Sequence, residues 1–299
     1  MMKRILLFVF GLTCMTLSAQ DIQYTKVDSI VVMKLLQDAL KLDKDNNLII
    51  HFSHQLLDIP YVAKTLEVNK SEQLIVNLRQ LDCTTFVENV MALTLCANNG
   101  KTSFEDFCKY LRLIRYRKGV VSYPTRLHYF TEWIEDNTQM NFVKEIQQPD
   151  SVFTQVQTLA INFMSTHSNL YPMLADNPLM IKDIEITEEN LTGRQFRYIP
   201  KEEISNTDAM RNAIQDGDII AITTKKKGLD TSHIGFAIWH LDGLHLINAS
   251  QIHKKVVEEP MTLYDYMQKH PSQKGIRIVR WIKDSTYSSP CVFDVGFRN

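Results

Sequence analysis

Residues 81–90 read LDCTTFVENV and begin a long apolar stretch of the chain. From Thr84 to Ala97 apolar residues recur at helical spacing, and Asp82 stands where an N-cap residue accepts hydrogen bonds from the first free N–H groups. We therefore predict a long helix whose N-terminus carries Cys83. Unpaired N–H groups and the positive end of the helix dipole favour a thiolate at such a position. The same N–H groups can bind the oxyanion that forms when a thiolate attacks a carbonyl.

Two interpretations of Cys83 compete at this point. A free cysteine is often a buried structural residue, and the neighbouring carboxylate of Asp82 disfavours a thiolate. A catalytic Cys83 therefore needs a histidine partner from elsewhere in the chain.

Residues 232–250, SHIGFAIWHLDGLHLINAS, supply candidates for that partner. His233 begins a predicted strand, where it can serve as a general base or be an ordinary hydrogen-bonded histidine. The next strand offers Asn248, whose side chain can accept from the second ring nitrogen and orient the imidazole. Cysteine, histidine and a polar orienter make up a nucleophile–base–orienter set.

The predicted secondary structure changes from helical to β-rich along the chain. Apolar spacing predicts helices over 28–43, 53–66, 103–117, 127–136 and 151–166, and one early strand over 72–78. Later strands are expected over 218–224, 233–239, 244–249, 255–258 and 275–282. Helices followed by an antiparallel meander predict an α+β fold. The segment of roughly 140–210 has weak periodicity and is expected to elaborate that domain.

These motifs resemble those of a known enzyme family. LDCTTFVENV resembles the Asp-Cys-(Ser/Thr)-x-Phe-Val box of the NlpC-type cell-wall cysteine peptidases, and the pair of strands from Ser232 resembles their SHxGI and xAS strands. The resemblance implies Cys83 as nucleophile, His233 as base and Asn248 as orienter. Family members often carry a second histidine at the last position, so Asn248 is a departure. A gap of 150 residues between the first two is also longer than in minimal members.

That long gap points to one branch of the family. IPYVAKTLE at 59–67 and RYRKGVVSYPTRLHYFTEWIEDN at 115–137 resemble the branch described as N-acetylmuramoyl-L-alanine amidase-like. The resemblance implies a papain-like α+β fold, with a helical N-terminal half packed on an antiparallel sheet. It also implies hydrolysis of the amide between muramic acid and L-Ala. We expect residues 20–299 to form one amidase domain, with an N-terminal helical extension and an insertion at about 100–210.

An aromatic and basic cluster within 116–137 is the candidate substrate-binding segment. Arg126 can pair bidentately with a substrate carboxylate, and aromatic faces suit sugar rings or peptide planes. The alternative is a helix start that packs Tyr129 and Trp133 into the core at i, i+4 spacing. The full set of substrate-binding candidates is Tyr123, Arg126, His128, Tyr129, Trp133 and Ser232.

The N-terminus has the composition of a secretory signal peptide. Lys3 and Arg4 precede an apolar run too short to span a bilayer, and Ala19 offers a cleavage site after residues 1–19. We expect export to the periplasm, with a lipid anchor at Cys14 as the less favoured alternative. No later stretch is apolar and long enough to predict a transmembrane helix.

The composition of the chain gives information on which ligands and partners the protein can bind. Lys plus Arg total 33 against 34 for Asp plus Glu, so the charge balance gives no argument for binding nucleic acid. Cys83, Cys96, Cys108 and Cys291 lack the spacing of metal ligands. The predicted reaction requires no metal and no organic cofactor, and the predicted partners are peptidoglycan fragments.

Two further hypotheses remain open from the sequence. A cell-wall endopeptidase would use the same three residues to cut within the stem peptide. A non-catalytic wall-binding protein could share the fold, although all three positions carry residues competent for catalysis. A papain-type protease is disfavoured because Cys83 lacks the surrounding C-G-(S/A)-C-(W/Y) pattern.

Overall fold

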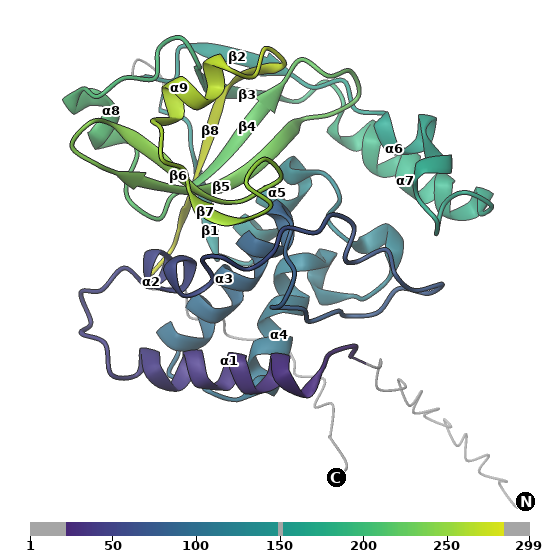
Figure 1. The fold of residues 1–299 in the computed structure, drawn as a ribbon. Helices are drawn as coiled ribbons and strands as arrows, with labels where there is room; N and C mark the ends of the chain where they lie inside the picture. The colour runs from purple at the N-terminus through teal and green to yellow at the C-terminus, as the bar shows by residue number, and fades with distance from the viewer. Residues whose placement is uncertain (1–21, 149–151, 284–299) are drawn as a thin grey trace, which may run out of the picture.

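Helix α3 (Cys83–Asn98) is the central helix of the molecule and packs against strands β5 (Thr231–Trp239) and β6 (Leu244–Ser250) (Figure 1). The computed structural model describes residues 22–148 and 152–283. Within α3 every residue from Thr85 to Cys96 is buried. A helix that is buried on every side needs cover on every side, and neighbouring helices cover α3 where the sheet leaves it free. The predicted signal peptide, Cys14 and Cys291 lie outside the described residues.

Short helices pack around α3 and form the lower half of the molecule in Figure 1. Asp82 caps α3 as predicted, since its carboxylate accepts from the Thr85 N–H at 2.8 Å. The surrounding elements are α1 (Lys26–Ala39), α2 (Leu48–Gln55), α4 (Phe104–Arg115), α5 (Phe130–Gln139) and the 3₁₀ turns η1 (Arg117–Gly119) and η2 (Tyr123–Thr125).

The described residues form an eight-stranded antiparallel sheet with the order β2-β3-β8-β4-β5-β6-β7, and β1 pairs with β8 off this path. The five strands predicted after residue 210 are all present, so the α+β prediction is confirmed. The strands are β1 (Val143–Ile146), β2 (Gln155–Thr158), β3 (Gln195–Pro200), β4 (Ile219–Thr224), β5 (Thr231–Trp239), β6 (Leu244–Ser250), β7 (Lys255–Glu258) and β8 (Gln273–Trp281).

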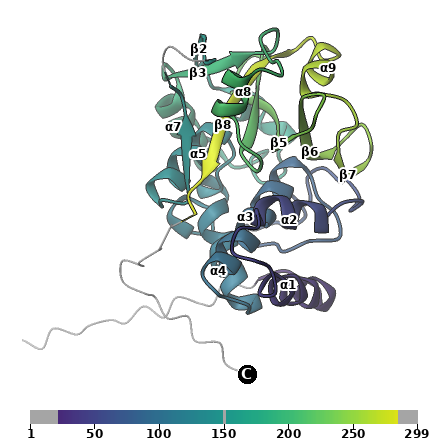
Figure 2. The ribbon, with the colours of Figure 1, turned by 90° about the vertical axis from the view of Figure 1, so that its left-hand side faces the viewer.

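The sheet has an apolar cluster on each face. Ile234, Phe236 and Ile247 belong to the large cluster shared with the helical half. Ala237 and Leu246 belong to a second cluster with residues of α9 (Leu263–Gln268) and α8 (Asp208–Ala213). Period-two alternation along β5 and β6 accounts for this division. Figure 2 shows α8 and α9 on the sheet half, away from α1 to α4.

The middle of the chain contributes strands as well as an outlying helical segment. Strands β1, β2 and β3 extend the sheet, whereas α6 (Phe163–Thr166), η3 (Ser168–Leu170) and α7 (Pro178–Leu191) project to one side (Figure 1). A third apolar cluster, which includes Tyr123, Tyr129 and Leu174, holds this segment to η2 and the start of α5.

Three local predictions were wrong. The helix predicted over 53–66 ends at Gln55, and turns follow it. No strand forms over 72–78: the Val76 N–H donates to the Gln23 carbonyl and the Leu78 N–H to the Asp28 carboxylate, so those donors are satisfied outside the sheet. A helix was also predicted over 151–166, but the described residues of that range form strand β2 and the short helix α6. The residues of β2 are extended because they pair with β3.

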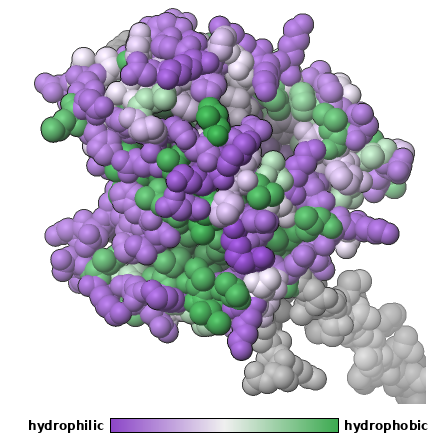
Figure 3. Space-filling view, viewed as in Figure 1, coloured by the Kyte–Doolittle hydropathy of each residue, from purple (hydrophilic) through white to green (hydrophobic). Residues whose placement is uncertain are grey.

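None of the described helices is both long and apolar enough to cross a membrane. Apolar side chains gather over α1 on the surface shown in Figure 3. Val27 and Ile30 are the exposed large apolar residues within α1.

Candidate active site

Cys83 is the first residue of α3, and its side chain is partly buried at the edge of the main apolar cluster. The first N–H groups of a helix have no intrahelical acceptor. Asp82 takes the one on Thr85, and the Thr85 hydroxyl in turn accepts from the Asp82 N–H at 2.9 Å. This reciprocal cap fixes the start of the helix and therefore the position of Cys83.

Two opposing influences act on the Cys83 thiol. Burial, followed by the adjacent Asp82 carboxylate, raises the pKa of Cys83 to about 12. Hydrogen bonds to the sulfur from the Ile234 backbone and from Thr84 act in the opposite direction. Burial dominates, so the arrangement favours a neutral thiol at neutral pH. The hydrogen bond with Ile234 also places the Cys83 sulfur beside β5, because Ile234 follows His233 in that strand.

His233 and Asn248 meet across β5 and β6, with His233 Nε2 and Asn248 Oδ1 2.9 Å apart. Asn248 is fully buried and His233 is partly exposed. Burial lowers the pKa of His233 below its ordinary value, while Asn248, Glu259 and Asp82 act to raise it. The imidazole is therefore biased towards the neutral form that a general base requires.

A glycine lets these two strands approach closely. A Cβ atom at Gly235 would lie 2.6 Å from the Ile247 carbonyl oxygen and 3.0 Å from the Asn248 Cβ. Any side chain at this position would push β6 away from β5. Gly235 therefore allows the separation at which Asn248 reaches His233.

Beneath Asn248 lies a carboxylate that the sequence did not suggest. The Asn248 amide donates through Nδ2 to Glu259 Oε1 at 3.1 Å, and His253 Nε2 lies 3.0 Å from Glu259 Oε2. Glu259 is 2% exposed. No local signal marks Glu259, because it follows the end of β7 and reaches Asn248 only through the strand pairing.

Two tyrosines near Cys83 were also missed. Burial, and next the Cys83 and Asp82 charges, raises the pKa of Tyr61 to about 12. Burial, with Glu259 and Cys83 among the further causes, also raises the pKa of Tyr266 to about 12. Both phenols therefore lie near Cys83, one from the loop after α2 and the other from α9.

Arg126 lies in a buried ion-pair cluster of its own. Its guanidinium pairs with Glu67 and lies 3.4 Å from a carboxylate oxygen of Glu72, and it stacks over the Tyr123 ring at 4.6 Å. The Arg126 side chain is 6% exposed. Glu67 and Glu72 therefore already neutralise the guanidinium charge that the sequence analysis expected to bind a substrate carboxylate.

The remaining predicted binding residues have partners within the protein. His128 Nε2 lies 2.8 Å from the Tyr123 carbonyl oxygen, and the Tyr129 hydroxyl donates to Glu188 at 2.6 Å. Trp133 is 1% exposed and stacks on Phe130. Ser232 is exposed immediately before His233. The structure thus pairs His233 with Asn248 and puts the Cys83 sulfur against Ile234, the residue after His233. It buries the aromatic residues of the cluster inside the protein.

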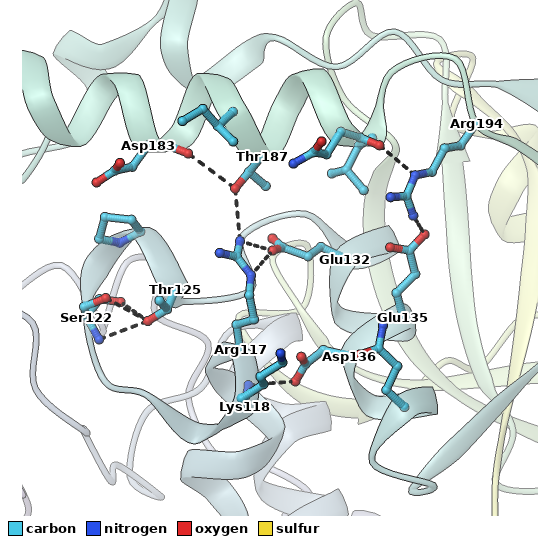
Figure 4. A pocket seen from close by; sticks show the side chains of 15 residues that line it. Arg117, Lys118, Ser122, Thr125, Glu132, Glu135, Asp136, Asp183, Thr187 and Arg194 are labelled. Atoms are coloured by element: carbon cyan, nitrogen blue, oxygen red, sulfur yellow. Dashed lines mark hydrogen bonds and ion pairs between the residues drawn. The ribbon is translucent and has the colours of Figure 1, made fainter.

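A cavity of about 580 Å³ lies elsewhere, between α5, α7 and the turns η1 and η2 (Figure 4). Its two arginines are paired with glutamates: Arg117 bonds Glu132 and donates to the Thr187 hydroxyl at 3.0 Å, and Arg194 pairs with Glu135. The residues that line the cavity include none of the predicted site residues. Among the described residues, no group of histidine, cysteine, aspartate or glutamate side chains has the arrangement of a metal site.

Comparison with known proteins identifies the class to which this fold and site belong. The chain is one of the amidase-like cell-wall hydrolases. Residues 51–276 match the model of the AmiA-like family, described as N-acetylmuramoyl-L-alanine amidase-like, and the chain belongs to that family.

Solved structures agree with the family match. An N-acetylmuramoyl-L-alanine amidase from Bacteroides uniformis is 36% identical, with a TM-score of 0.73 over 79% of this chain and 97% of that one. A Bacteroides fragilis protein described as a candidate xylanase is 37% identical, with a TM-score of 0.71 over 76% of this chain and 98% of that one. A Legionella pneumophila protein at 22% identity and a TM-score of 0.61, over 85% of this chain and 94% of that one, shares the fold. No curated protein matched the sequence.

Proposed function

We propose that this protein is an exported cysteine amidase that hydrolyses the amide between N-acetylmuramic acid and L-Ala in peptidoglycan fragments. The observation that carries the proposal is the hydrogen-bonded pair of His233 and Asn248, with the sulfur of Cys83 at the start of α3 hydrogen-bonded to Ile234, the residue after His233. Family membership and the amidase from Bacteroides uniformis support the substrate class. Export rests on the predicted signal peptide over residues 1–19.

The first step is attack by the Cys83 sulfur on the lactyl carbonyl carbon of the muramic acid. Because burial favours the neutral forms of both Cys83 and His233, we infer that the thiol proton passes to His233 as the sulfur–carbon bond forms. Asn248 accepts from the resulting imidazolium and stabilises its orientation. N–H groups at the start of α3 are the candidate donors to the oxyanion.

The second step breaks the carbon–nitrogen bond of the tetrahedral intermediate. His233 gives its proton to the departing nitrogen of L-Ala, which leaves as the free amine of the stem peptide. Water, activated by the now neutral His233, then attacks the thioester. This releases the muramic acid carboxylate and restores the Cys83 thiol.

Product identity is the experiment that tests this function. Digestion of MurNAc-L-Ala-D-Glu-diaminopimelate should release free muramic sugar and a tripeptide that begins with L-Ala, both identified by mass. Cys83→Ala should release neither, and His233→Ala should be slower by roughly 10²–10⁴-fold. Release of a dipeptide, or of sugar still carrying one, would instead show an endopeptidase.

A xylo-oligosaccharide in a parallel digestion tests the activity suggested by the name of the Bacteroides fragilis relative. Glycoside hydrolysis ordinarily needs two carboxyl groups on either side of the scissile bond. In this site Asp82 is occupied by the cap of α3 and Glu259 is buried behind Asn248. We therefore expect the xylo-oligosaccharide to remain intact.

A further inference from the structure

Glu259 is held in place through its backbone as well as its side chain. Its N–H donates to the Leu246 carbonyl oxygen at 2.9 Å, and its own carbonyl oxygen lies 2.8 Å from His245 Nδ1. Both carboxylate oxygens have partners, one on Asn248 and one on His253. A buried carboxylate fixed at this many points has one orientation, and it presents Oε1 to the Asn248 amide.

The side-chain amide of asparagine has a donor end and an acceptor end. In this structure the NH₂ group of Asn248 donates to Glu259 Oε1, which fixes the orientation of the amide. The Asn248 oxygen then necessarily faces His233 Nε2, 2.9 Å away. That oxygen can only accept, and a hydrogen bond therefore requires a proton on His233 Nε2. In the neutral imidazole the other nitrogen, Nδ1, is then left with a free lone pair.

We propose that Glu259 is a positioning residue for the reaction, acting through Asn248 to keep the proton of neutral His233 on Nε2 and the lone pair on Nδ1. The inference rests on the proposed function, because it assigns Nδ1 as the atom that takes the proton of the Cys83 thiol. Without Glu259 the Asn248 amide can rotate, present its NH₂ group to His233, and stabilise the opposite tautomer.

The neighbouring residue offers a matched control. Glu258 also pairs with histidines, His54 at 2.9 Å and His240 at 2.6 Å, and is partly exposed at 27% of its side chain. Within the part of the chain that the structure describes, its side-chain partners are these two histidines and neither Asn248 nor His233. Glu258→Gln therefore removes an equivalent carboxylate one residue away, outside the proposed network.

Steady-state kinetics provide the first test. Glu259→Ala should lower kcat by roughly ten- to hundred-fold, by analogy with the loss of an outer-shell partner that orients a metal-ligating histidine, with KM nearly unchanged. Glu259→Gln keeps an acceptor for the Asn248 amide and should retain most of the activity. Glu258→Gln should behave as the wild type. Equal kcat values for Glu259→Ala and Glu258→Gln would overturn the inference.

A charge exchange separates positioning from mere packing. Asn248→Asp puts a second carboxylate against Glu259 and should be poorly active, because two buried carboxylates in contact cannot both ionise. Adding Glu259→Gln provides a donor to the new aspartate, so the double variant should regain much of the activity that Asn248→Asp loses. A double variant no more active than Asn248→Asp would contradict the proposed network.

The tautomer of His233 can be measured whether or not the amidase function is correct. In the full-length protein labelled with ¹⁵N-histidine, with the His233 signals assigned by a His233→Gln variant, the unprotonated nitrogen should be Nδ1. Glu259→Ala should shift protonation towards Nδ1. If the wild type cleaves no muropeptide but the shift occurs, the amidase proposal fails and the role of Glu259 stands. An unchanged tautomer would overturn the role of Glu259 itself.

Discussion

Phe86 on α3 packs edge-on against Phe236 on β5, with their ring centroids 5.6 Å apart. Each ring lies three residues after a candidate catalytic residue, Phe86 after Cys83 and Phe236 after His233. Both rings are fully buried. This contact therefore sets the spacing between the helix that carries the sulfur and the strand that carries the imidazole.

Removing the Phe86 ring should affect stability and activity together. Phe86→Ala should lower the free energy of unfolding by about 3–5 kcal/mol, as large-to-small core substitutions do, and should lower kcat because helix and strand lose their spacing. Phe107 on α4 is equally buried, so Phe107→Ala is the control. Urea denaturation and kinetics of both variants provide the measurement. A kcat loss no larger in Phe86→Ala than in Phe107→Ala would argue against this role of the contact.

The Asp82 charge should restrain the reactivity of Cys83. Asparagine is as good an N-cap as aspartate, so Asp82→Asn should keep α3 intact while removing the carboxylate that raises the pKa of the thiol. Iodoacetamide should then alkylate Cys83 faster than in the wild type at the same mildly alkaline pH. Cys96 and Cys108, which are buried, should be alkylated more slowly than Cys83 in both proteins. Equal or slower labelling of Cys83 in Asp82→Asn would disprove the electrostatic explanation.

The pH dependence of kcat/KM should report the neutral imidazole. Burial lowers the pKa of His233 from 6.5, and the base must be unprotonated to act. Activity should therefore be complete at neutral pH and decline only as the pH falls through the lowered pKa. Since the pKa of Cys83 is raised to about 12, no second rise should appear at mildly alkaline pH. An acid limb with its midpoint above 6.5 would mean that His233 is stabilised in its charged form.

Arg126 should prove to be a residue of the folded core. Arg126→Met leaves Glu67 and Glu72 without their cation, and breaking a buried pair in this way costs about 3–5 kcal/mol of stability. Lys34 forms an exposed pair with Asp38, both side chains being well exposed, so Lys34→Met should cost less than about 1 kcal/mol. Chemical denaturation compares the two variants. If Arg126→Met instead raised KM strongly without loss of stability, the substrate-carboxylate role predicted from the sequence would be correct.

Short-range signals explain which parts of the molecule could be predicted. The cap at Asp82 and the helix after it follow from residues within one turn of each other, and the strands that carry His233 and Asn248 follow from alternation and turns. The segment over 151–166 was mistaken for a helix because its pairing with β3 is non-local.

The partners of the candidate site residues could not be predicted from local patterns, because these contacts are also non-local. Glu259 approaches Asn248 through the pairing of β6 with β7. Arg126 finds Glu67 and Glu72 more than fifty residues earlier in the chain. Spacing within one strand or helix carries no information on either contact, and burial of the charges becomes visible only in the folded chain.

The covalent intermediate provides the most direct test of the account, because its composition reports both the nucleophile and the bond that is cut. Acid quenching during turnover of MurNAc-L-Ala-D-Glu-diaminopimelate, followed by peptide mapping by mass spectrometry, should find Cys83 carrying an N-acetylmuramoyl group as a thioester. The adduct should contain no amino acid of the stem peptide. A Cys83 adduct that includes L-Ala and D-Glu, or turnover with the acyl group on a residue other than Cys83, would contradict the account.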